Sequence, residues 1–274
     1  MEIISGKAIA DELKANLRLY NTNAGISPCL AVVDLGDNRE NELYIGLKKA
    51  AVQAIGGITR IIHMDQAVKR EAVLGKIQEL NQDPAVDGIL LQLPLPAGLD
   101  KYQEDFLEAI APHKDVDGFC PRNRGLLMGD EPGFISCAAM ACMDVCSRYM
   151  SPLAGKRVLL VGNSFDVIQP LALIFIKALC DVSIIPSYTP EAINDMDIAI
   201  IEAGFPLMVK PEGVKPGVLL IDAGFHWHEE RVCGNIDRDA FAELEGYLLP
   251  VPGGMGPLLI AQLMVNLSQA AQKR

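Results

Sequence analysis

The sequence contains no C-x-x-C pair, no apolar run of membrane-spanning length and fewer basic than acidic residues. Its seven cysteines are an odd number spread through apolar surroundings, which predicts reduced, buried thiols rather than a disulfide framework. The 24 basic and 35 acidic residues give a net charge of −11, which argues against nucleic acid or an anionic membrane as partner. Residues 1–6 do not begin a signal peptide, so we expect a cytoplasmic protein.

Strand and helix patterns alternate along the chain, which predicts an α/β fold with parallel sheets. Expected strands lie at 29–33, 59–63, 88–93, 156–161, 181–186, 197–203 and 218–223, and expected helices at 7–20, 41–55, 71–82, 137–149 and 257–271. A polar, turn-rich stretch at 129–133 indicates a boundary between two domains. We find no internal repeat.

Residues 250–257 read Pro-Val-Pro-Gly-Gly-Met-Gly-Pro. Proline fixes φ and glycine reaches φ values that other residues avoid, so their alternation predicts a rigid loop whose backbone can approach a flat ligand. The alternative is a tight connection into the terminal helix.

Two motifs pair groups suited to proton transfer. Tyr44 and Lys48 stand four residues apart on an expected helix and therefore share a face, where a phenol and an amine can orient a substrate and pass a proton. Gln92 interrupts an apolar strand near its carboxyl end, where α/β sheets place ligands. A surface lysine beside a core tyrosine, and a glutamine bonded to loop backbone, are the structural alternatives.

Two further patterns carry polar side chains. Asp115 and Asp117 alternate around a valine, and one of them can bind the N–H groups of a heterocycle unless the segment is only a solvated turn. His226 and His228 flank a tryptophan, but without a third ligand they do not predict a metal site.

Taken together, the motifs resemble those of the methylenetetrahydrofolate dehydrogenase/cyclohydrolase family over nearly the whole chain. They are Tyr44-x-x-x-Lys48, Gly88-Ile-Leu-Leu-Gln-Leu-Pro-Leu-Pro96, Lys114-Asp-Val-Asp-Gly-Phe119, Asn123-x-Gly125, Val214-Lys-Pro-Gly217 with Ile221-Asp222-x-Gly224, and Pro250-Val-Pro-Gly-Gly-x-Gly-Pro257. The resemblance implies a catalytic domain of residues 1–134, completed by the helix of 257–274, and a Rossmann-like domain of 135–256. It also implies a cleft between the domains and a homodimer.

The activity implied by the resemblance is oxidation of 5,10-methylenetetrahydrofolate by hydride transfer to NADP or NAD, followed by hydrolysis of the methenyl form to 10-formyltetrahydrofolate. No metal is implied. Lys48 would be the central acid/base, Tyr44 would position the folate ring, Gln92 would hold Lys48, and Asp117 would bind the pterin edge. Further expected contacts are Pro252, Gly253 and Gly254 with the folate, and Gly162, Asn163, Ser164, Gly204 and Asp222 with the dinucleotide.

The dinucleotide loop departs from the family pattern V-G-R-S-x-x-V-G-x-P. Here Asn163 replaces the arginine, Asp166 adds a carboxylate and Ile168 replaces a glycine. Because an arginine–phosphate contact is strong and a nearby carboxylate opposes it, we expect weakened NADP binding or a preference for NAD. The alternatives are a cyclohydrolase that has lost dinucleotide binding and a non-catalytic folate-binding subunit. We expect the bifunctional enzyme, because a pure binder has no need of a lysine beside a glutamine.

Overall fold

The computed structural model describes residues 1–36 and 39–273. The chain divides into two compact units. The three-stranded unit comprises Asp11–Cys137 and Ile260–Arg274, and the six-stranded unit comprises Met1–Ala10 and Ala138–Leu259. The division falls within three helices, α1 (Gly6–Ala24), α6 (Cys137–Tyr149) and α8 (Met255–Gln272).

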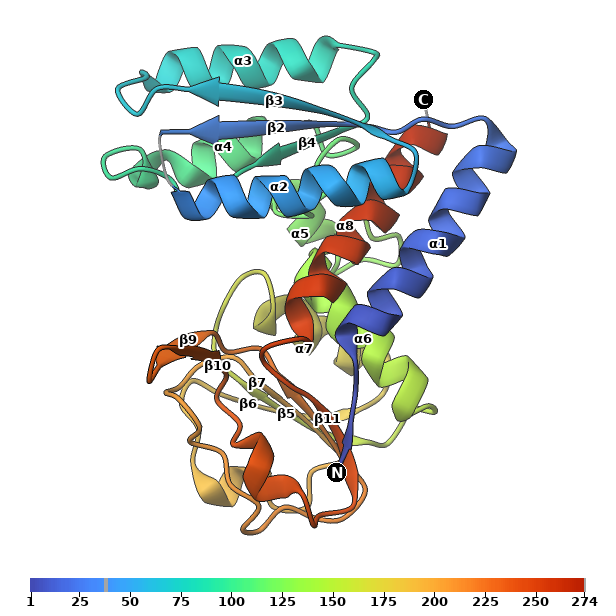
Figure 1. The fold of residues 1–274 in the computed structure, drawn as a ribbon, viewed down its shortest axis with the longest axis vertical. Helices are drawn as coiled ribbons and strands as arrows, with labels where there is room; N and C mark the ends of the chain where they lie inside the picture. Colours follow the sequence, from blue (N-terminus) through green and yellow to red (C-terminus); the bar gives the residue numbers. More distant parts are fainter. Residues whose placement is uncertain (37–38, 274) are drawn as a thin grey trace. The chain divides into compact units, whose positions relative to one another are not determined.

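The three-stranded unit is built on a parallel sheet with the strand order β3-β2-β4. The strands are β2 (Cys29–Leu35), β3 (Ile58–Met64) and β4 (Gly88–Leu91). The helices that belong to this unit alone are α2 (Arg39–Ala54), α3 (Arg70–Gln82), α4 (Gln103–Ala109) and α5 (Pro121–Leu126). α2 and α3 lie on opposite faces of the sheet (Figure 1). All seven residues of β2 are buried, as expected of a central parallel strand covered on both faces.

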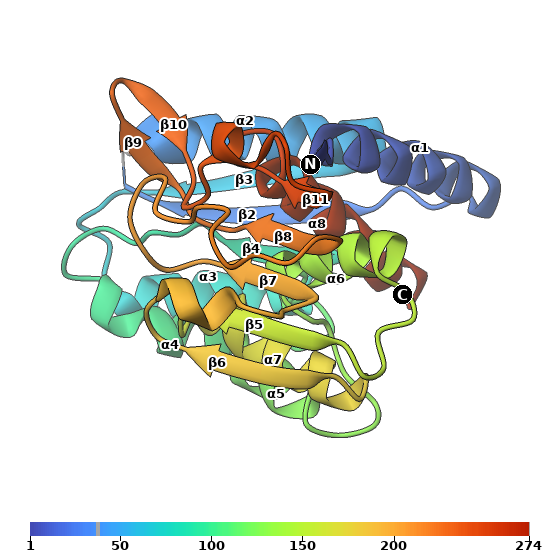
Figure 2. The same ribbon diagram turned by 90° about the horizontal axis from the view of Figure 1, so that it is seen from below.

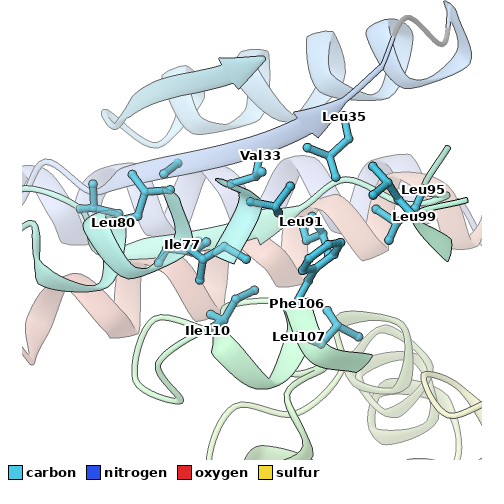
Figure 3. Close-up of a cluster of buried hydrophobic side chains, with 14 of the residues drawn as sticks. Val33, Leu35, Ile77, Leu80, Leu91, Leu95, Leu99, Phe106, Leu107 and Ile110 are labelled. Atoms are coloured by element: carbon cyan, nitrogen blue, oxygen red, sulfur yellow. The ribbon is translucent and has the colours of Figure 1, made fainter. Parts of the chain in front are cut away.

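One apolar cluster holds α3 and α4 to the sheet, and Figure 3 shows its side chains interdigitating. Alternate residues of the strands, among them Val33, Leu35 and Leu91, face it. Phe106 of α4 is completely buried in the cluster. The same alternation directs the remaining residues of β2 and β4 toward the other face, which α2 covers.

The six-stranded unit has a parallel sheet with the order β1-β11-β8-β7-β5-β6, and Figure 2 shows the strands from β11 to β6 in this order. Its strands are β1 (Glu2–Ile3), β5 (Arg157–Val161), β6 (Asp181–Ile185), β7 (Ile198–Ile201), β8 (Val218–Asp222) and β11 (Gly246–Leu249). Two short strands, β9 (His226–His228) and β10 (Arg231–Cys233), form a separate antiparallel hairpin. The helices are α6 (Cys137–Tyr149) and α7 (Ile168–Lys177), and α7 packs against β5 and β6.

Each sheet has a point where the chain reverses its direction of winding. In the three-stranded unit β2 leads to β3 on one side, and the chain then returns to β4 on the other side. In the six-stranded unit β5 leads to β6, and the chain returns to β7 across β5. Ligands of open α/β sheets bind outside the carboxyl ends of the strands at such points. The candidate ligand-binding positions are therefore Gln92, after β4, and the loops that follow β5 and β7.

The α/β fold class expected from the sequence is confirmed. Several boundaries differ, and α4, α5, α7 and β11 were not among the expected elements. β4 ends at Leu91, so Gln92 follows the strand; α8 begins at Met255, which places Pro257 in the first turn, where no backbone amide is needed for helix bonding. The sequence analysis missed α7, whose apolar residues cover more than one face. None of the helices in the described ranges is both long and apolar enough to cross a bilayer.

Candidate active site

Lys48 and Gln92 form the central polar contact of the three-stranded unit. Lys48 Nζ donates a hydrogen bond to Gln92 Oε1 at 2.9 Å. Gln92 Nε2 donates to the carbonyl oxygen of Leu93 at 2.8 Å, which fixes the amide and turns Oε1 toward the lysine. Gln92 is 4% exposed and Lys48 is half-buried. The structure thus brings together two residues that the sequence placed in separate motifs.

Tyr44 lies one helical turn before Lys48 on α2. Its side chain is exposed to 43%, which is unusual for a tyrosine held in a core. The structural alternative of a core tyrosine therefore does not hold, and the ring is accessible on the face of α2 that carries Lys48.

Asp115 and Asp117 differ in what surrounds them. The Asp115 carboxylate is buried and accepts hydrogen bonds from the backbone N–H groups of Phe119 (3.1 Å) and Cys120 (2.9 Å) and from Asn123 Nδ2 (2.8 Å). It therefore organises the turn that leads into α5. Asp117 is half-buried, which leaves it as the accessible acid of the motif.

The buried thiol of Cys137 relates Asp117 to Lys48. Burial raises the pKa of Cys137 well above its usual value, the carboxylates of Asp117 and Asp115 raise it further, and Lys48 lowers it. Charge interactions weaken with distance, so Lys48 and Asp117 both lie near this thiol. A lysine, its glutamine and an accessible carboxylate therefore belong to one locality of the three-stranded unit.

The proline- and glycine-rich loop lies in the six-stranded unit, between β11 and α8. Gly253 has a φ of 97°, which favours glycine. A Cβ atom on Gly254 would collide with the carbonyl oxygen of Pro250, and one on Gly6 would collide with that of Gly254. Pro252 and Gly253 are exposed, whereas Gly254 is buried. The glycines are thus required by the loop's own shape, and the exposed part of the loop can still contact a ligand.

The loop after β5 is the phosphate-binding candidate, and two carboxylates surround it. Gly162 has a φ of 135°, and a Cβ atom there would lie 2.5 Å from Glu202 Oε2. Burial raises the pKa of Glu202 and of Asp166; a side-chain hydrogen bond with Ser164 lowers both pKa values, and the Asp166 charge raises that of Glu202. Two acids therefore meet at Ser164, and only Asp166 was noted from the sequence.

Ser164 also occupies donors of the first turn of α7. Its Oγ accepts hydrogen bonds from the backbone N–H groups of Val167 (3.1 Å) and Ile168 (3.2 Å). The backbone N–H of Gln169 donates to the carbonyl oxygen of Ser164 at 3.0 Å. Asn163, the second residue of the loop, is exposed. A phosphate at this helix terminus would compete with Ser164 for the amides.

Gly204 and Asp222, the other expected cofactor residues, follow β7 and end β8. Gly204 is exposed with a φ of 149°. Asp222 is buried and accepts backbone hydrogen bonds from Gly224 (3.1 Å), Asn235 (3.0 Å) and Ile236 (2.8 Å). Burial raises the pKa of Asp222 to about 6, although these hydrogen bonds lower it. The Asp222 carboxylate thus holds the loop at 234–236 to the sheet.

Two polar groups of the three-stranded unit escaped the sequence analysis. Asp34 Oδ2 lies 3.2 Å from His63 Nδ1, and Asp34 is buried at the carboxyl end of β2. The signal for it in the sequence is a carboxylate inside an apolar strand.

His226, one of the two histidines that flank Trp227, belongs to the six-stranded unit, where its Nε2 lies 2.9 Å from Asn235 Oδ1. No cluster of three or more potential metal ligands occurs within residues 1–36 and 39–273.

Comparison with known proteins identifies the class. Residues 4–117 match the model of the tetrahydrofolate dehydrogenase/cyclohydrolase catalytic domain, and residues 136–274 match that of the family's NAD(P)-binding domain. Bifunctional protein FolD 1 of Syntrophomonas wolfei is 52% identical over 276 residues, covering 100% of both chains. The crystal structure of the bifunctional FolD dehydrogenase/cyclohydrolase of Campylobacter jejuni superposes with a TM-score of 0.94 at 33% identity, covering 100% of this chain and 99% of that one.

A third relative is the Trypanosoma brucei FolD enzyme, whose structure was determined with NADP and an inhibitor. It has a TM-score of 0.90 and 28% identity, covering 99% of this chain and 97% of that one. The chain belongs to the tetrahydrofolate dehydrogenase/cyclohydrolase family. Dehydrogenase and cyclohydrolase activity on tetrahydrofolate derivatives, with a nicotinamide dinucleotide as cofactor, is accordingly its function.

The backbone of the six-stranded unit is suited to binding a dinucleotide, whereas the charges around its loop of 162–168 are not. The β5–loop–α7 arrangement and the reversal of winding at β5 suit the approach of a dinucleotide. The loop of 162–168 contains no lysine or arginine, while Asp166 and Glu202 add negative charge around Ser164. The backbone of this unit therefore fits a nicotinamide dinucleotide, with carboxylates in place of a basic side chain beside the loop.

Proposed function

We propose that Lys48 is the acid/base of this bifunctional enzyme, which interconverts 5,10-methylene- and 5,10-methenyltetrahydrofolate and hydrolyses the methenyl form to 10-formyltetrahydrofolate. The observation that carries the proposal is the 2.9 Å hydrogen bond from Lys48 Nζ to the buried Gln92 Oε1. A non-catalytic folate binder does not require an amine held by a buried amide.

Hydrolysis adds water to the cationic methenyl carbon, breaks one carbon–nitrogen bond and releases one proton. An amine beside that carbon can take a proton from the attacking water and return it to the departing ring nitrogen. Gln92 keeps the amine in place because its own amide is anchored on Leu93. Proton transfer by Lys48 therefore accounts for the cyclohydrolase reaction without a metal.

Other residues bind the folate. Tyr44 offers an exposed ring for stacking, one turn from Lys48. Asp117, the accessible acid of its motif, accepts N–H groups of the pterin edge. Pro252 and Gly253, exposed in their loop, contact the folate, and Gly254 maintains the shape of the loop.

A bound dinucleotide would supply the hydride acceptor for oxidation of the methylene carbon. Gly162, Asn163, Ser164 and Gly204 would line its site, and Asp222 would hold the neighbouring loop of 234–236 in place. We infer that NAD binds more tightly than NADP, because Asp166 and Glu202 repel an additional phosphate. The same two carboxylates favour a second candidate function, a cyclohydrolase in which dinucleotide binding is too weak for hydride transfer.

Calorimetric titration of the purified protein tests both candidates. The titrants are NAD, NADP and 5-formyltetrahydrofolate, a stable folate whose one-carbon group is uncharged. Binding of the folate and of NAD more tightly than NADP supports the bifunctional enzyme. Binding of the folate with neither dinucleotide supports the cyclohydrolase alone, and no folate binding contradicts the proposal.

The assembly and location of the protein are also proposals. Phe205, Phe225 and Trp227 are exposed to more than half, and the last two belong to or adjoin the β9–β10 hairpin. Exposed apolar side chains of this kind favour a homodimer, which light scattering tests directly. All seven cysteines lie in the described part of the chain as free thiols, which is typical of the reducing cytoplasm.

A further inference from the structure

Three polar side chains form a row across the carboxyl ends of β3, β2 and β4. His63 is the register partner of Asp34. Val33 pairs with Leu91, and the backbone N–H of Gln92 donates to the carbonyl oxygen of Val33 at 2.9 Å. The ladder therefore continues for one residue, and Asp34 stands beside Gln92 on the neighbouring strand.

Asp34 and Gln92 also face the same side of the sheet. Their neighbours Val33, Leu35 and Leu91 face the apolar cluster that contains α3 and α4, as Figure 3 shows. Side chains alternate along a strand, so Asp34 and Gln92 face the side of α2, from which Lys48 reaches Gln92. Adjacent strands are about 4.8 Å apart. Asp34 is therefore a neighbour of the Lys48–Gln92 pair, at the reversal point between β2 and β4.

Only one of the two carboxylate oxygens of Asp34 has a hydrogen-bond partner among the described residues. Its Oδ2 lies 3.2 Å from His63 Nδ1, but its Oδ1 is buried without a hydrogen-bond partner among the described residues. The Asp34 side chain is 8% exposed and that of His63 is 50% exposed. Buried polar atoms are usually hydrogen-bonded, and an exception calls for an explanation. A positive charge brought by a ligand is one such explanation.

We propose that Asp34 is a specificity-determining residue that acts as the counter-charge for the cationic methenyl carbon. The inference rests on the proposed function, which places that carbon at Lys48. Of the folates that this reaction handles, only the methenyl form carries a positive charge at the one-carbon group. A negative charge at this position stabilises the methenyl form relative to the methylene and formyl forms, whose one-carbon groups are uncharged. It thereby favours both its formation by hydride removal and its capture for hydrolysis.

The expected size of the effect follows from Coulomb's law. Two unit charges about 6 Å apart at an effective dielectric of about 20 attract by an amount equivalent to roughly a hundredfold in affinity. Partial screening by His63 and solvent reduces this to about tenfold, which binding and kinetic measurements resolve.

Asp34→Asn keeps the size of the side chain and removes its charge. We expect kcat/KM for methenyltetrahydrofolate hydrolysis to fall about tenfold, while the inhibition constant of 5-formyltetrahydrofolate changes less than twofold. Asp87→Asn is the matched control, since Asp87 is buried just before the opposite, amino-terminal end of β4, where it accepts from the N–H of Cys29 at 2.8 Å. It should show no selective loss for the cation.

A second pair of variants leaves Asp34 intact, in case Asp34→Asn fails to fold. His63→Lys places a permanent positive charge beside Asp34 and should reproduce the selective loss, whereas His63→Gln should not. Equal losses for the methenyl and 5-formyl folates, or none, overturn the counter-charge. Failure of the wild-type protein to bind 5-formyltetrahydrofolate or to hydrolyse the methenyl form overturns the proposed function instead.

Discussion

Lys48 Nζ and Gln92 Oε1 meet at 2.9 Å, although 44 residues separate them in the chain. The lysine comes from α2, and the glutamine follows β4 at the point where the winding of the sheet reverses. The amide is buried and anchored on Leu93, so Gln92 fixes the position at which the lysine amine is held. This geometry is the basis of the account of catalysis, and it makes the glutamine as testable as the lysine.

Gln92→Leu should lower cyclohydrolase kcat roughly 10- to 100-fold, because the amine loses the hydrogen bond that positions it. The KM for the methenyl folate should change little. Steady-state hydrolysis assays check both values. Gln262→Leu, which changes a buried glutamine of α8, is the control and should retain activity. Full activity of Gln92→Leu would show that Lys48 does not depend on this contact.

The two aspartates of the Asp-Val-Asp motif should separate stability from binding. Asp115→Ala leaves three donors without their acceptor and should lower the free energy of unfolding by about 2–4 kcal/mol. Asp117→Ala should cost less than about 1 kcal/mol but weaken folate binding by about tenfold or more. Urea unfolding and calorimetry measure the two effects. The reverse pattern would assign the binding role to Asp115.

Reversing the charge of the dinucleotide loop should tighten NADP binding. Asn163→Arg combined with Asp166→Ile and Glu202→Gln removes two acids and restores a cation, and the dissociation constant for NADP should fall by about tenfold or more. Ile168 is best left unchanged, since it is buried and a glycine there would leave a cavity. Asp181→Asn, an exposed change at the start of β6, is the control. An unchanged constant would show that these charges do not control cofactor choice.

Asp222 should make stability depend on pH. Its pKa is raised to about 6 in the folded protein and is about 3.9 in the unfolded chain, so the folded form holds more protons between these values. Its contribution is therefore fully present below about pH 4 and is lost as the pH rises through about 6, an effect of about 3 kcal/mol. Asp222→Asn should lack that component of the slope when unfolding is followed from pH 4 to 7. Parallel curves for the two proteins would contradict the assignment.

The fold was predictable because its signals are local. Buried apolar runs such as Cys29–Leu35 and the alternation of strands with helices define an α/β chain without any knowledge of long-range contacts. α7 was missed because its residues, from Ile168 onward, are apolar on several faces and show no single helical stripe. The domain bounds of 1–134, 135–256 and 257–274 stay predictions. The two compact units are defined by contacts within the chain, whereas the predicted domains are defined by the ligand that each one binds.

The sequence marks a candidate site residue where that residue stands out from its own segment. Gln92 in an apolar strand and Lys48 after Tyr44 were found in this way. Glu202 and Asp34 were missed, because each stands at or just beyond the end of a strand, and its significance depends on a neighbouring strand or loop. Asp115 and Asp117 could not be distinguished in sequence, since only the fold shows which carboxylate the turn uses.

Lys48→Met tests the central claim most directly, with Lys49→Met, an exposed change one residue away, as its control. The account predicts that methenyltetrahydrofolate hydrolysis falls by about a thousandfold in Lys48→Met, while the dissociation constant for 5-formyltetrahydrofolate stays within about threefold of the wild-type value. Lys49→Met should match the wild type in both. Sustained hydrolysis by Lys48→Met would contradict the assignment of Lys48 as the acid/base.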